Sequence, residues 1–237
     1  MGQADARVWR RGIIVVLIRD AATLIVLRDQ THVLMGQRGA SAAFMPSKFV
    51  FPGGAVDSGD AGILLAAGLN PLCAARLANQ SPLAPATVAT TAIRELWEET
   101  GQRLSRPAAW PDAPPDWQTF AAPGQRPDAS GLTFIFRAIT PPGSPRRFDA
   151  RFFLADSTHL TTDPDDFSHA APELGSVQWV PLAQARSYDL PFITQIVLAE
   201  LSARLRGQVP DSIPFMRHDD EAHHFARLGG QHPLDGL

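Results

Sequence analysis

The 237-residue sequence predicts a mixed α/β sandwich, folded as a single domain that carries insertions. The first reason is the order of its segments: β-rich runs, a strongly periodic helix, further β-rich runs and a late amphipathic helix. The second is composition, because 45% hydrophobic and 19% charged residues are typical of a globular protein with a sizeable core. The chain exceeds one ordinary domain of about 100–200 residues, and segments that interrupt the pattern account for the excess.

Four segments rich in β-branched and large apolar residues open the chain, and each is predicted to be a strand. They cover residues 11–19, 22–28, 31–37 and 48–54. Asp20 and Ala21 separate the first two segments, which are therefore predicted to be two short strands. The fourth strand is broken by Pro52-Gly53-Gly54, which is predicted to be a turn. Its glycines allow the backbone to approach a ligand closely.

The most strongly predicted helix runs from Pro85 to Thr100. Its apolar residues recur at i, i+3, i+4 and i+7 and form one stripe, which consists of Ala89, Ala92, Ile93 and Leu96. Gly101 follows the last periodic turn and supplies the C-cap. Upstream, the Ala- and Leu-rich residues 61–83 are predicted to form one or two short helices.

The second half of the chain repeats the alternation after an irregular stretch. Residues 105–130 carry six prolines and are predicted to be an excursion without regular structure. The later elements are predicted strands at 132–139, 150–155 and 176–180 and an amphipathic helix at 191–206. The tail from Gln208 holds four of the seven histidines and is predicted to form a polar hairpin. A transition-metal site built from His218, His223 and His224 is the alternative.

Charge and cysteine content exclude several classes of protein. The net charge of −3 and the pI near 6.1 argue against a nucleic-acid binder, which needs a basic surface. Cys73 is the single cysteine, so neither an intrachain disulfide nor a cysteine-based metal site is expected. The apolar run of seven residues from Gly12 to Ile18 is too short for a membrane span of about 20 and is predicted to be a buried strand. We therefore expect a soluble, cytoplasmic protein without a membrane partner.

The segment Arg94–Gly101 carries the most informative chemistry. Glu95, Glu98 and Glu99 lie within an arc of about 100° on one helix face. They occupy the last two turns, where the helix dipole and their mutual repulsion both disfavour negative charge. Clustered carboxylates without Cys or His suit hard cations such as Mg²⁺ or Mn²⁺. The alternative is an acidic helix face in water.

Two separated pieces of sequence resemble the two halves of the Nudix box. They are Gly54-x5-Asp60 and Arg94-Glu-Leu-x-Glu-Glu-x-Gly101. The second half matches at every fixed position except the last, where Gln102 replaces an apolar residue, and the first half has Asp60 where the family has Glu. Residues 61–93 number 33 where the pattern has 7, which is an insertion of 26. The chain is thus identified as resembling the Nudix hydrolases.

The long insertion is similar to that of one branch, the peroxisomal coenzyme A diphosphatases of animals and their bacterial relatives. Residues 136–141 and 145–153 also resemble that branch, and the whole resemblance covers about residues 11–206. It implies a Nudix α/β/α sandwich over residues 8–207. Within it, 61–93 form an enlarged box loop and 105–130 the Pro-rich excursion, and 208–237 are a C-terminal tail.

The resemblance also implies the metal and catalytic groups. Nudix enzymes cleave a diphosphate by attack of water on phosphorus, assisted by divalent cations. Carried over, the metal ligands are Glu95, Glu98, Glu99 and the Gly53 carbonyl, and Glu95 or Glu98 doubles as the base. Arg94 orients the glutamates. Glu173, ahead of a later strand, is the candidate for a further base or ligand, with a solvated loop carboxylate as the alternative.

Candidates for binding the substrate are basic and backbone groups near the Gly-Gly turn. They are Arg38, Lys48, Gly54 and Arg147. For Arg146, Arg147 and Arg151, phosphate binding competes with pairing to Asp149, and the lone basic residues could equally be solvated. Trp110 and Trp117 are predicted to anchor the Pro-rich excursion, with stacking on a base as the alternative.

The predicted function is metal-dependent hydrolysis of a nucleoside diphosphate linked to another moiety. Coenzyme A or acyl-CoA is the leading substrate, and dinucleotides or ADP-ribose are the alternatives. A different class, a Nudix module that senses a ligand without catalysis, usually lacks box glutamates, and all three are present here. An acidic helical adaptor without an active site is a third interpretation. A homodimer is compatible with the resemblance, because family members often pair.

Overall fold

The computed structural model describes residues 7–10, 13–42, 44–208, 212–218 and 223–228. Its main sheet has nine strands: β3 (Ile18–Arg28), β4 (His32–Arg38), β5 (Phe49–Val50), β6 (Gly53–Ala55), β9 (Thr133–Ile139), β10 (Arg147–Asp156), β11 (Leu174–Pro181), β12 (Ile213–His218) and β13 (His223–Leu228). Their order is β11-β4-β3-β10-β9-β12-β13, with β5 paired to β4 and β6 to β3. β3 with β10 and β9 with β12 are parallel pairs and the others are antiparallel, so the sheet is mixed.

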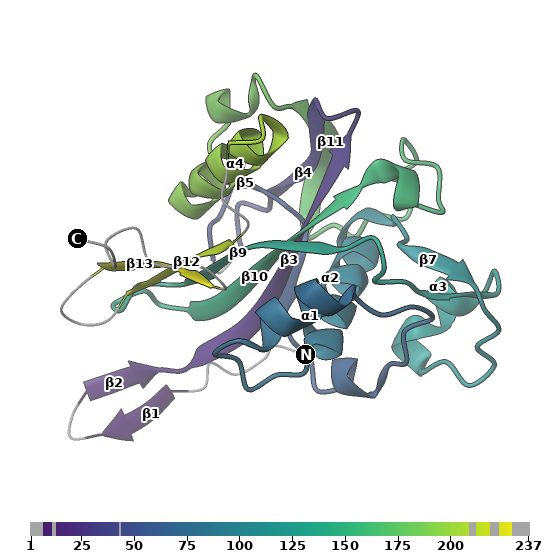
Figure 1. Cartoon of the computed structure of the whole chain (residues 1–237), viewed down its shortest axis with the longest axis horizontal. Helices are drawn as coiled ribbons and strands as arrows, with labels where there is room; N and C mark the ends of the chain where they lie inside the picture. The colour runs from purple at the N-terminus through teal and green to yellow at the C-terminus, as the bar shows by residue number, and fades with distance from the viewer. Residues whose placement is uncertain (1–6, 11–12, 43, 209–211, 219–222, 229–237) are drawn as a thin grey trace.

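Helices cover both faces of this sheet, as Figure 1 shows. On one face, α1 (Pro71–Ala78) and α2 (Pro85–Thr100) bury Leu77, Ile93 and Leu96 against residues such as Leu24 of β3. On the other, α4 (Phe192–Leu205) buries its apolar side against a second cluster that includes Ile25 of β3. Alternate residues of β3 therefore serve two cores, as the period-2 geometry of a strand requires. The predicted α/β sandwich is confirmed.

The predicted break between two strands at Asp20 and Ala21 is wrong. β3 runs through both residues, because β10 pairs with it in one continuous parallel register from Ile18 to Leu27. The break falls earlier, before Ile18, and the preceding β1 (Arg7–Arg10) and β2 (Ile13–Val16) pair only with each other in a separate hairpin (Figure 1). The Asp20 side chain accepts a hydrogen bond from Arg151, a buried arginine of β10, which explains a charged residue inside this strand.

The predicted central helix is confirmed from Pro85 to Thr100. Gly101 ends it with a left-handed φ of 74°, and its N–H donates to the Trp97 carbonyl at 2.8 Å. Residues 61–83 contain one helix, α1, whose N-cap Asn70 accepts a hydrogen bond from the Cys73 N–H at 2.8 Å. The later predicted strands and helix appear as β9, β10, β11 and α4.

The Pro-rich excursion is more ordered than the sequence predicts. β7 (Ser105–Pro107) and β8 (Gln125–Pro127) pair antiparallel, and the short helix α3 (Gln118–Ala121) lies between them along the chain. Trp117 is buried against the Phe120 ring, with ring centroids 5.2 Å apart. This packing agrees with the interpretation that Trp117 anchors the excursion. None of the helices in the described part of the chain has the length and apolar character of a membrane span.

A buried ionic network joins the box insertion to the sheet. Asp149 of β10 accepts from Arg137 of β9 at 2.8 and 2.6 Å, and Arg151 Nη2 lies 3.3 Å from it. Arg151 also donates to Asp20 and to the Ser81 hydroxyl. Arg137 donates to the carbonyls at positions 79 and 80, in the insertion. For Arg151, pairing with Asp149 is therefore the interpretation that the structure supports.

Replacing Asp149 by Leu tests this network. The change leaves two buried guanidinium groups without their shared partner, so we expect a loss of about 3–5 kcal/mol in the free energy of unfolding. Urea denaturation of both proteins measures it.

The control for this prediction is Asp165→Leu, which breaks the exposed pair with Arg28. That variant should lose much less stability than Asp149→Leu, because an exposed ion pair contributes little. Equal losses in the two variants would contradict a structural role for the buried network.

Candidate functional site

The acidic end of α2 lies almost in contact with β6. A Cβ atom on Gly54 would lie 2.4 Å from Glu95 Oε1, and one on Gly53 would lie 2.6 Å from the carbonyl oxygen of Ala22. The contact with backbone excludes a side chain at Gly53, and a side chain at Gly54 would have to displace the Glu95 carboxylate. The predicted turn is wrong at the two glycines themselves: the chain bends at Pro52, and Gly53 and Gly54 lie in β6, where they bring the strand backbone directly against Glu95.

Glu99 is the most deeply buried carboxylate of the cluster, with 4% of its surface exposed. Its Oε2 accepts the Gly53 N–H at 2.8 Å, and the nearest cation, Arg38 Nη1, is 4.0 Å from Oε1. Burial, with repulsion from Glu95, raises the pKa of Glu99 to about 8. Burial likewise raises the pKa of Glu95 to about 7, although Arg94 opposes the shift.

Arg94 is buried and holds four groups at once. Its Nη1 donates to Glu95 Oε1 and to Glu98 Oε2, both at 2.9 Å. Its Nε and Nη2 donate to the two oxygens of Asp60 at 2.9 and 3.1 Å, and Nη2 also donates to the Ala55 carbonyl at 3.0 Å. Arg94 therefore contacts two of the three box glutamates, as a residue that orients them would, and this role stays a prediction.

Asp60 reaches Arg94 although its side chain is one methylene shorter than that of the glutamate in the family pattern. It is 2% exposed and accepts hydrogen bonds from Arg94, from the Thr91 hydroxyl at 2.7 Å and from the Asp57 N–H at 3.0 Å. The 3₁₀ turn Asp60–Gly62 brings its backbone close enough for Asp to serve where the family has Glu. Thr91 was not singled out by sequence, because a threonine inside a helix carries no distinctive signal.

Glu98 differs from its two neighbours. Its side chain is 43% exposed, it pairs with Arg94, and it does not line the cleft that Glu95 and Glu99 face. Partial burial, more than any other cause, raises its pKa. Among the described residues, no three His, Cys, Asp or Glu side chains gather into a ready metal-holding group.

Gln102 explains one departure from the family pattern. It is fully buried, and its amide donates to the carbonyls of Asp163 and Asp166 at 3.1 and 2.9 Å while its oxygen accepts from the Thr162 hydroxyl. These bonds fix the loop that ends at Glu173 against the end of α2. An apolar residue at position 102 could not make them, so the polar substitution was itself the signal of a docked loop.

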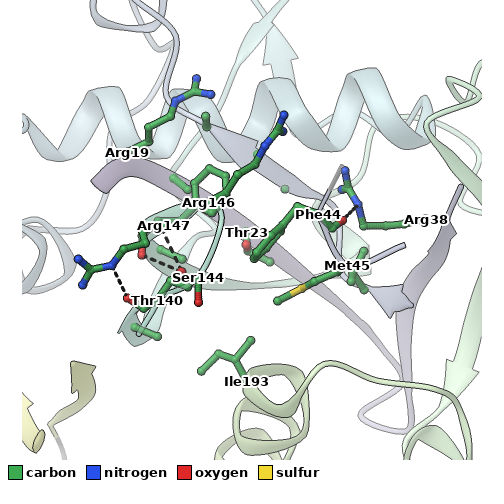
Figure 2. Close-up of a pocket in the computed structure, with 18 of the residues that line it drawn as sticks. Arg19, Thr23, Arg38, Phe44, Met45, Thr140, Ser144, Arg146, Arg147 and Ile193 are labelled. Carbon is green, nitrogen blue, oxygen red and sulfur yellow. Dashed lines mark hydrogen bonds between the residues drawn. The ribbon is translucent and has the colours of Figure 1, made fainter. Parts of the chain in front are cut away.

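A cleft of about 2010 Å³ opens beside these carboxylates. It is lined by Gly53 and Gly54, by Glu95, Glu99 and Glu173, by residues 38, 39, 41, 42, 44 and 45, by the cleft-facing side chains of β3 and β10, and by the start of α4. Figure 2 shows Arg19, Arg146 and Arg147 on one side of it, Arg38 on the other, and Phe44, Met45 and Ile193 between and below them. The structure thus brings an acidic end and several arginines to one open site.

The predicted substrate-binding residues divide into two groups. Arg38, Gly54 and Arg147 line the cleft, with Arg38 Nε bonded to the Phe44 carbonyl at 3.1 Å and Arg147 Nε to the Thr140 carbonyl at 3.0 Å (Figure 2). Lys48 lies outside the lining, and its Nζ is 2.5 Å from Asp189 Oδ1. The sequence around Lys48 gives no sign of this partner, because Asp189 is 141 residues away along the chain.

The histidine-based metal site predicted as an alternative for the tail lies outside the described residues. The side chains of His218 and His223 and the acidic residues 219–221 are not described. Of the two tryptophans considered for stacking on a base, neither lines the large cleft.

The donor set of the cleft fits a divalent cation. The buried Glu99 and the partly buried Glu95 are oxygen donors that line the same cleft, and a single close ion pair, between Arg94 and Glu95, offsets their charge. Hard oxygen ligands of this kind are those that Mg²⁺ and Mn²⁺ prefer. Glu95 and Glu99 together carry more negative charge than the nearby protein cations balance. A bound divalent cation would supply the counter-charge that these carboxylates need to stay ionised.

Two comparisons with known proteins, one by structure and one by sequence, point to the same family. No protein-family model matches the chain. A crystal structure of a Nudix hydrolase from Alicyclobacillus acidocaldarius is similar to it, with 32% sequence identity, a TM-score of 0.61, and coverage of 78% of this chain and 91% of that one. Putative nudix hydrolase 7 of Caenorhabditis elegans is 31% identical over 193 residues, which cover 73% of this chain and 57% of the worm protein. The chain therefore spans little more than half of that relative's length.

The raised pKa values predict how stability depends on pH. Glutamates of the unfolded chain titrate near about 4.3, whereas Glu99 and Glu95 in the metal-free fold titrate near 8 and 7. The folded state thus retains protons that the unfolded state has released, so this contribution to stability is lost as pH rises from about 4.3 to 8. In EDTA, Glu99→Gln should therefore match the wild type in Tm at pH 5 and exceed it at pH 8.5.

Adding Mn²⁺ supplies the control for this prediction. It should raise the wild-type Tm more at pH 8.5 than at pH 6, because protons compete with the metal for the carboxylates. A difference in Tm between the two proteins that is the same at every pH would contradict the assigned titrations.

Proposed function

Because this chain belongs to the Nudix hydrolase family, we propose that it hydrolyses the diphosphate bond of a nucleoside diphosphate linked to a second moiety, using Mg²⁺ or Mn²⁺. One observation carries the proposal: the buried Glu99 and the partly buried Glu95 line a single cleft, and protein cations do not fully balance their charge. The divalent cations would supply the positive charge that the two glutamates lack. The diphosphate would supply the negative charge that the arginines of the cleft attract.

The roles of the residues follow from their places. Divalent cations, when bound, neutralise charge on the diphosphate oxygens and lower the pKa of the attacking water. Glu95, Glu98, Glu99 and the Gly53 carbonyl are the proposed ligands. Arg94 holds Glu95 in a fixed orientation through a charge-assisted hydrogen bond. Glu95 and Glu173 are the carboxylates on the cleft that can take a proton from the water.

The basic groups on the cleft would receive the substrate's phosphates. Arg38 stands next to Glu99, so it can reach a phosphate held at the acidic end. Arg147 also lines the cleft, and its Nε is fixed by the Thr140 carbonyl. Phosphate oxygens accept such hydrogen bonds in pairs from a guanidinium group.

Coenzyme A or an acyl derivative is the substrate that we propose first. The enlarged box loop and the segments at 136–141 and 145–153 support it through their resemblance to the coenzyme A diphosphatase branch. Dinucleotides and ADP-ribose are the alternatives within the same chemistry. A ligand-sensing Nudix module is the alternative of another class, and the complete set of box glutamates favours catalysis over it.

A variant at Glu99 tests the proposed chemistry. Glu99→Gln keeps the shape and the hydrogen bond from Gly53 but removes the charge, so kcat should fall at least about 100-fold, the equivalent of several kcal/mol of lost charge stabilisation. Chromatographic separation of the two phosphomonoester products formed from coenzyme A, ADP-ribose and a dinucleotide measures it in the presence of Mn²⁺.

The matched control is Glu200→Gln, which changes a glutamate of α4 that lies outside the cleft. It should leave kcat unchanged. Mn²⁺ binding by calorimetry separates the classes: unaltered Mn²⁺ affinity in Glu99→Gln, or no hydrolysis of any of the three substrates by the wild type, would overturn the enzyme assignment.

A further inference from the structure

The cleft extends far beyond its acidic end. Its volume of about 2010 Å³ exceeds the roughly 300–1,000 Å³ of ordinary small-molecule sites. Glu95 and Glu99 occupy one end, and the cleft continues across the sheet to Met216 of β12. The residues between these points decide what the rest of the cleft can hold.

The floor between these points is a row of four alanines in register. Ala55 of β6 pairs with Ala21 of β3, Ala21 pairs with Ala150 of β10, and Ala150 pairs with Ala138 of β9. Ala138 pairs in turn with Met216. Directly paired residues point to the same face of a sheet, and all five line the cleft. We call this row of four alanines the alanine floor.

Larger side chains border the alanine floor on both sides. Residues two positions apart in a strand share a face, so Ala150 is flanked by Phe148 and Phe152 on β10. On β3, Arg19 and Thr23 flank Ala21 in the same way. The floor is therefore the bottom of a trough that crosses the strands. With strands about 4.8 Å apart, the trough is about 19 Å long from Ala55 to Met216.

The upper surfaces of the trough are apolar and partly open. Ile193 and Ile196 of α4 line it, and the Phe44 ring meets the Phe148 ring edge-on at 5.3 Å. At the rim, Phe192 is 72% exposed and Ile18 44% exposed. Large apolar groups gathered around a groove in this way mark a surface that binds an apolar ligand.

The trough begins at the catalytic end without a gap. Ala55 directly follows Gly54, whose Cα lies against the Glu95 carboxylate, and the Ala55 carbonyl accepts from Arg94. A substrate whose diphosphate lies at Glu95 and Glu99 therefore has one of its two halves directed along the alanine floor. The methyl groups of the floor offer no hydrogen-bond partner to the edge of a nucleobase or to a sugar hydroxyl.

Resting on the proposed function, we infer that the trough selects the substrate's second moiety, and that this moiety is a long, flexible, largely uncharged arm rather than a compact sugar or a second nucleoside. Ala150 and Ala138 are the specificity-determining residues, because any larger side chain there would fill the trough at its middle. Met216 closes the far end and so limits the length of the arm.

Ala150→Leu tests this inference, with Ala150→Ser as the control that keeps the width of the trough. The ligands are octanoyl-coenzyme A, which carries a long arm, and ADP-ribose, which does not. We expect Ala150→Leu to lower kcat/KM for the long-arm ligand at least about tenfold and to leave that for ADP-ribose within about twofold. Ala150→Ser should behave as the wild type with both.

Calorimetric binding to the metal-free protein in EDTA keeps this inference separate from the proposed chemistry. Octanoyl-coenzyme A should bind Ala150→Leu at least about tenfold more weakly than the wild type even if neither hydrolyses it, in which case only the proposed function fails. Equal weakening for both ligands would assign the trough to the nucleoside and overturn the inference. No weakening for either, or no preference of the wild type for the long arm, would overturn it as well.

Met216→Ala is the second variant, and it opens the trough instead of filling it. The acyl chain length that gives the highest kcat/KM should become longer, and thermal unfolding checks that the fold is intact. An unchanged preference for chain length in a folded Met216→Ala protein would contradict the assignment of Met216 as the end of the trough.

Discussion

The buried guanidinium group of Arg94 is the interaction on which the rest of the site depends. It fixes Asp60 at the start of the box insertion, the Ala55 carbonyl of β6, and Glu95 and Glu98 of α2 in one place. Those groups come from segments that are far apart in the sequence. A planar, permanently charged group with several donors can satisfy them together, which a lysine could not.

The cluster beside Arg94 holds more negative charge than the protein compensates. Arg94 is paired with Asp60, Glu95 and Glu98, so it does not neutralise Glu99. Glu99 is left with the Gly53 N–H and with Arg38, whose Nη1 is 4.0 Å away. Burial then holds protons on the carboxylates until a stronger cation displaces them, as the raised pKa of Glu99 shows. The same property makes the metal-free fold sensitive to pH and makes the site suited to divalent cations.

The insertions support the site from outside. The residues between α1 and α2 are tied to β9 and β10 through Arg137 and Arg151, so the long box loop is anchored to the sheet before α2 begins. Gln102 fixes the loop that delivers Glu173 to the cleft. The excess length thus supports one core from outside, and the cleft lies on the face of the sheet that α4 packs against, beside the C-terminal end of α2.

Local patterns in the sequence determined the helix at 85–100, its cap at Gly101 and the family, because each depends on spacing within short segments. Tertiary structure alone decided that Asp20 lies inside a strand, that Lys48 pairs away from the cleft, and that Glu98 turns outward. It also decided that four alanines scattered from position 21 to 150 form one floor. The physical reason is strand register: it is set by pairing between distant segments, and no local pattern encodes which alanine will face which.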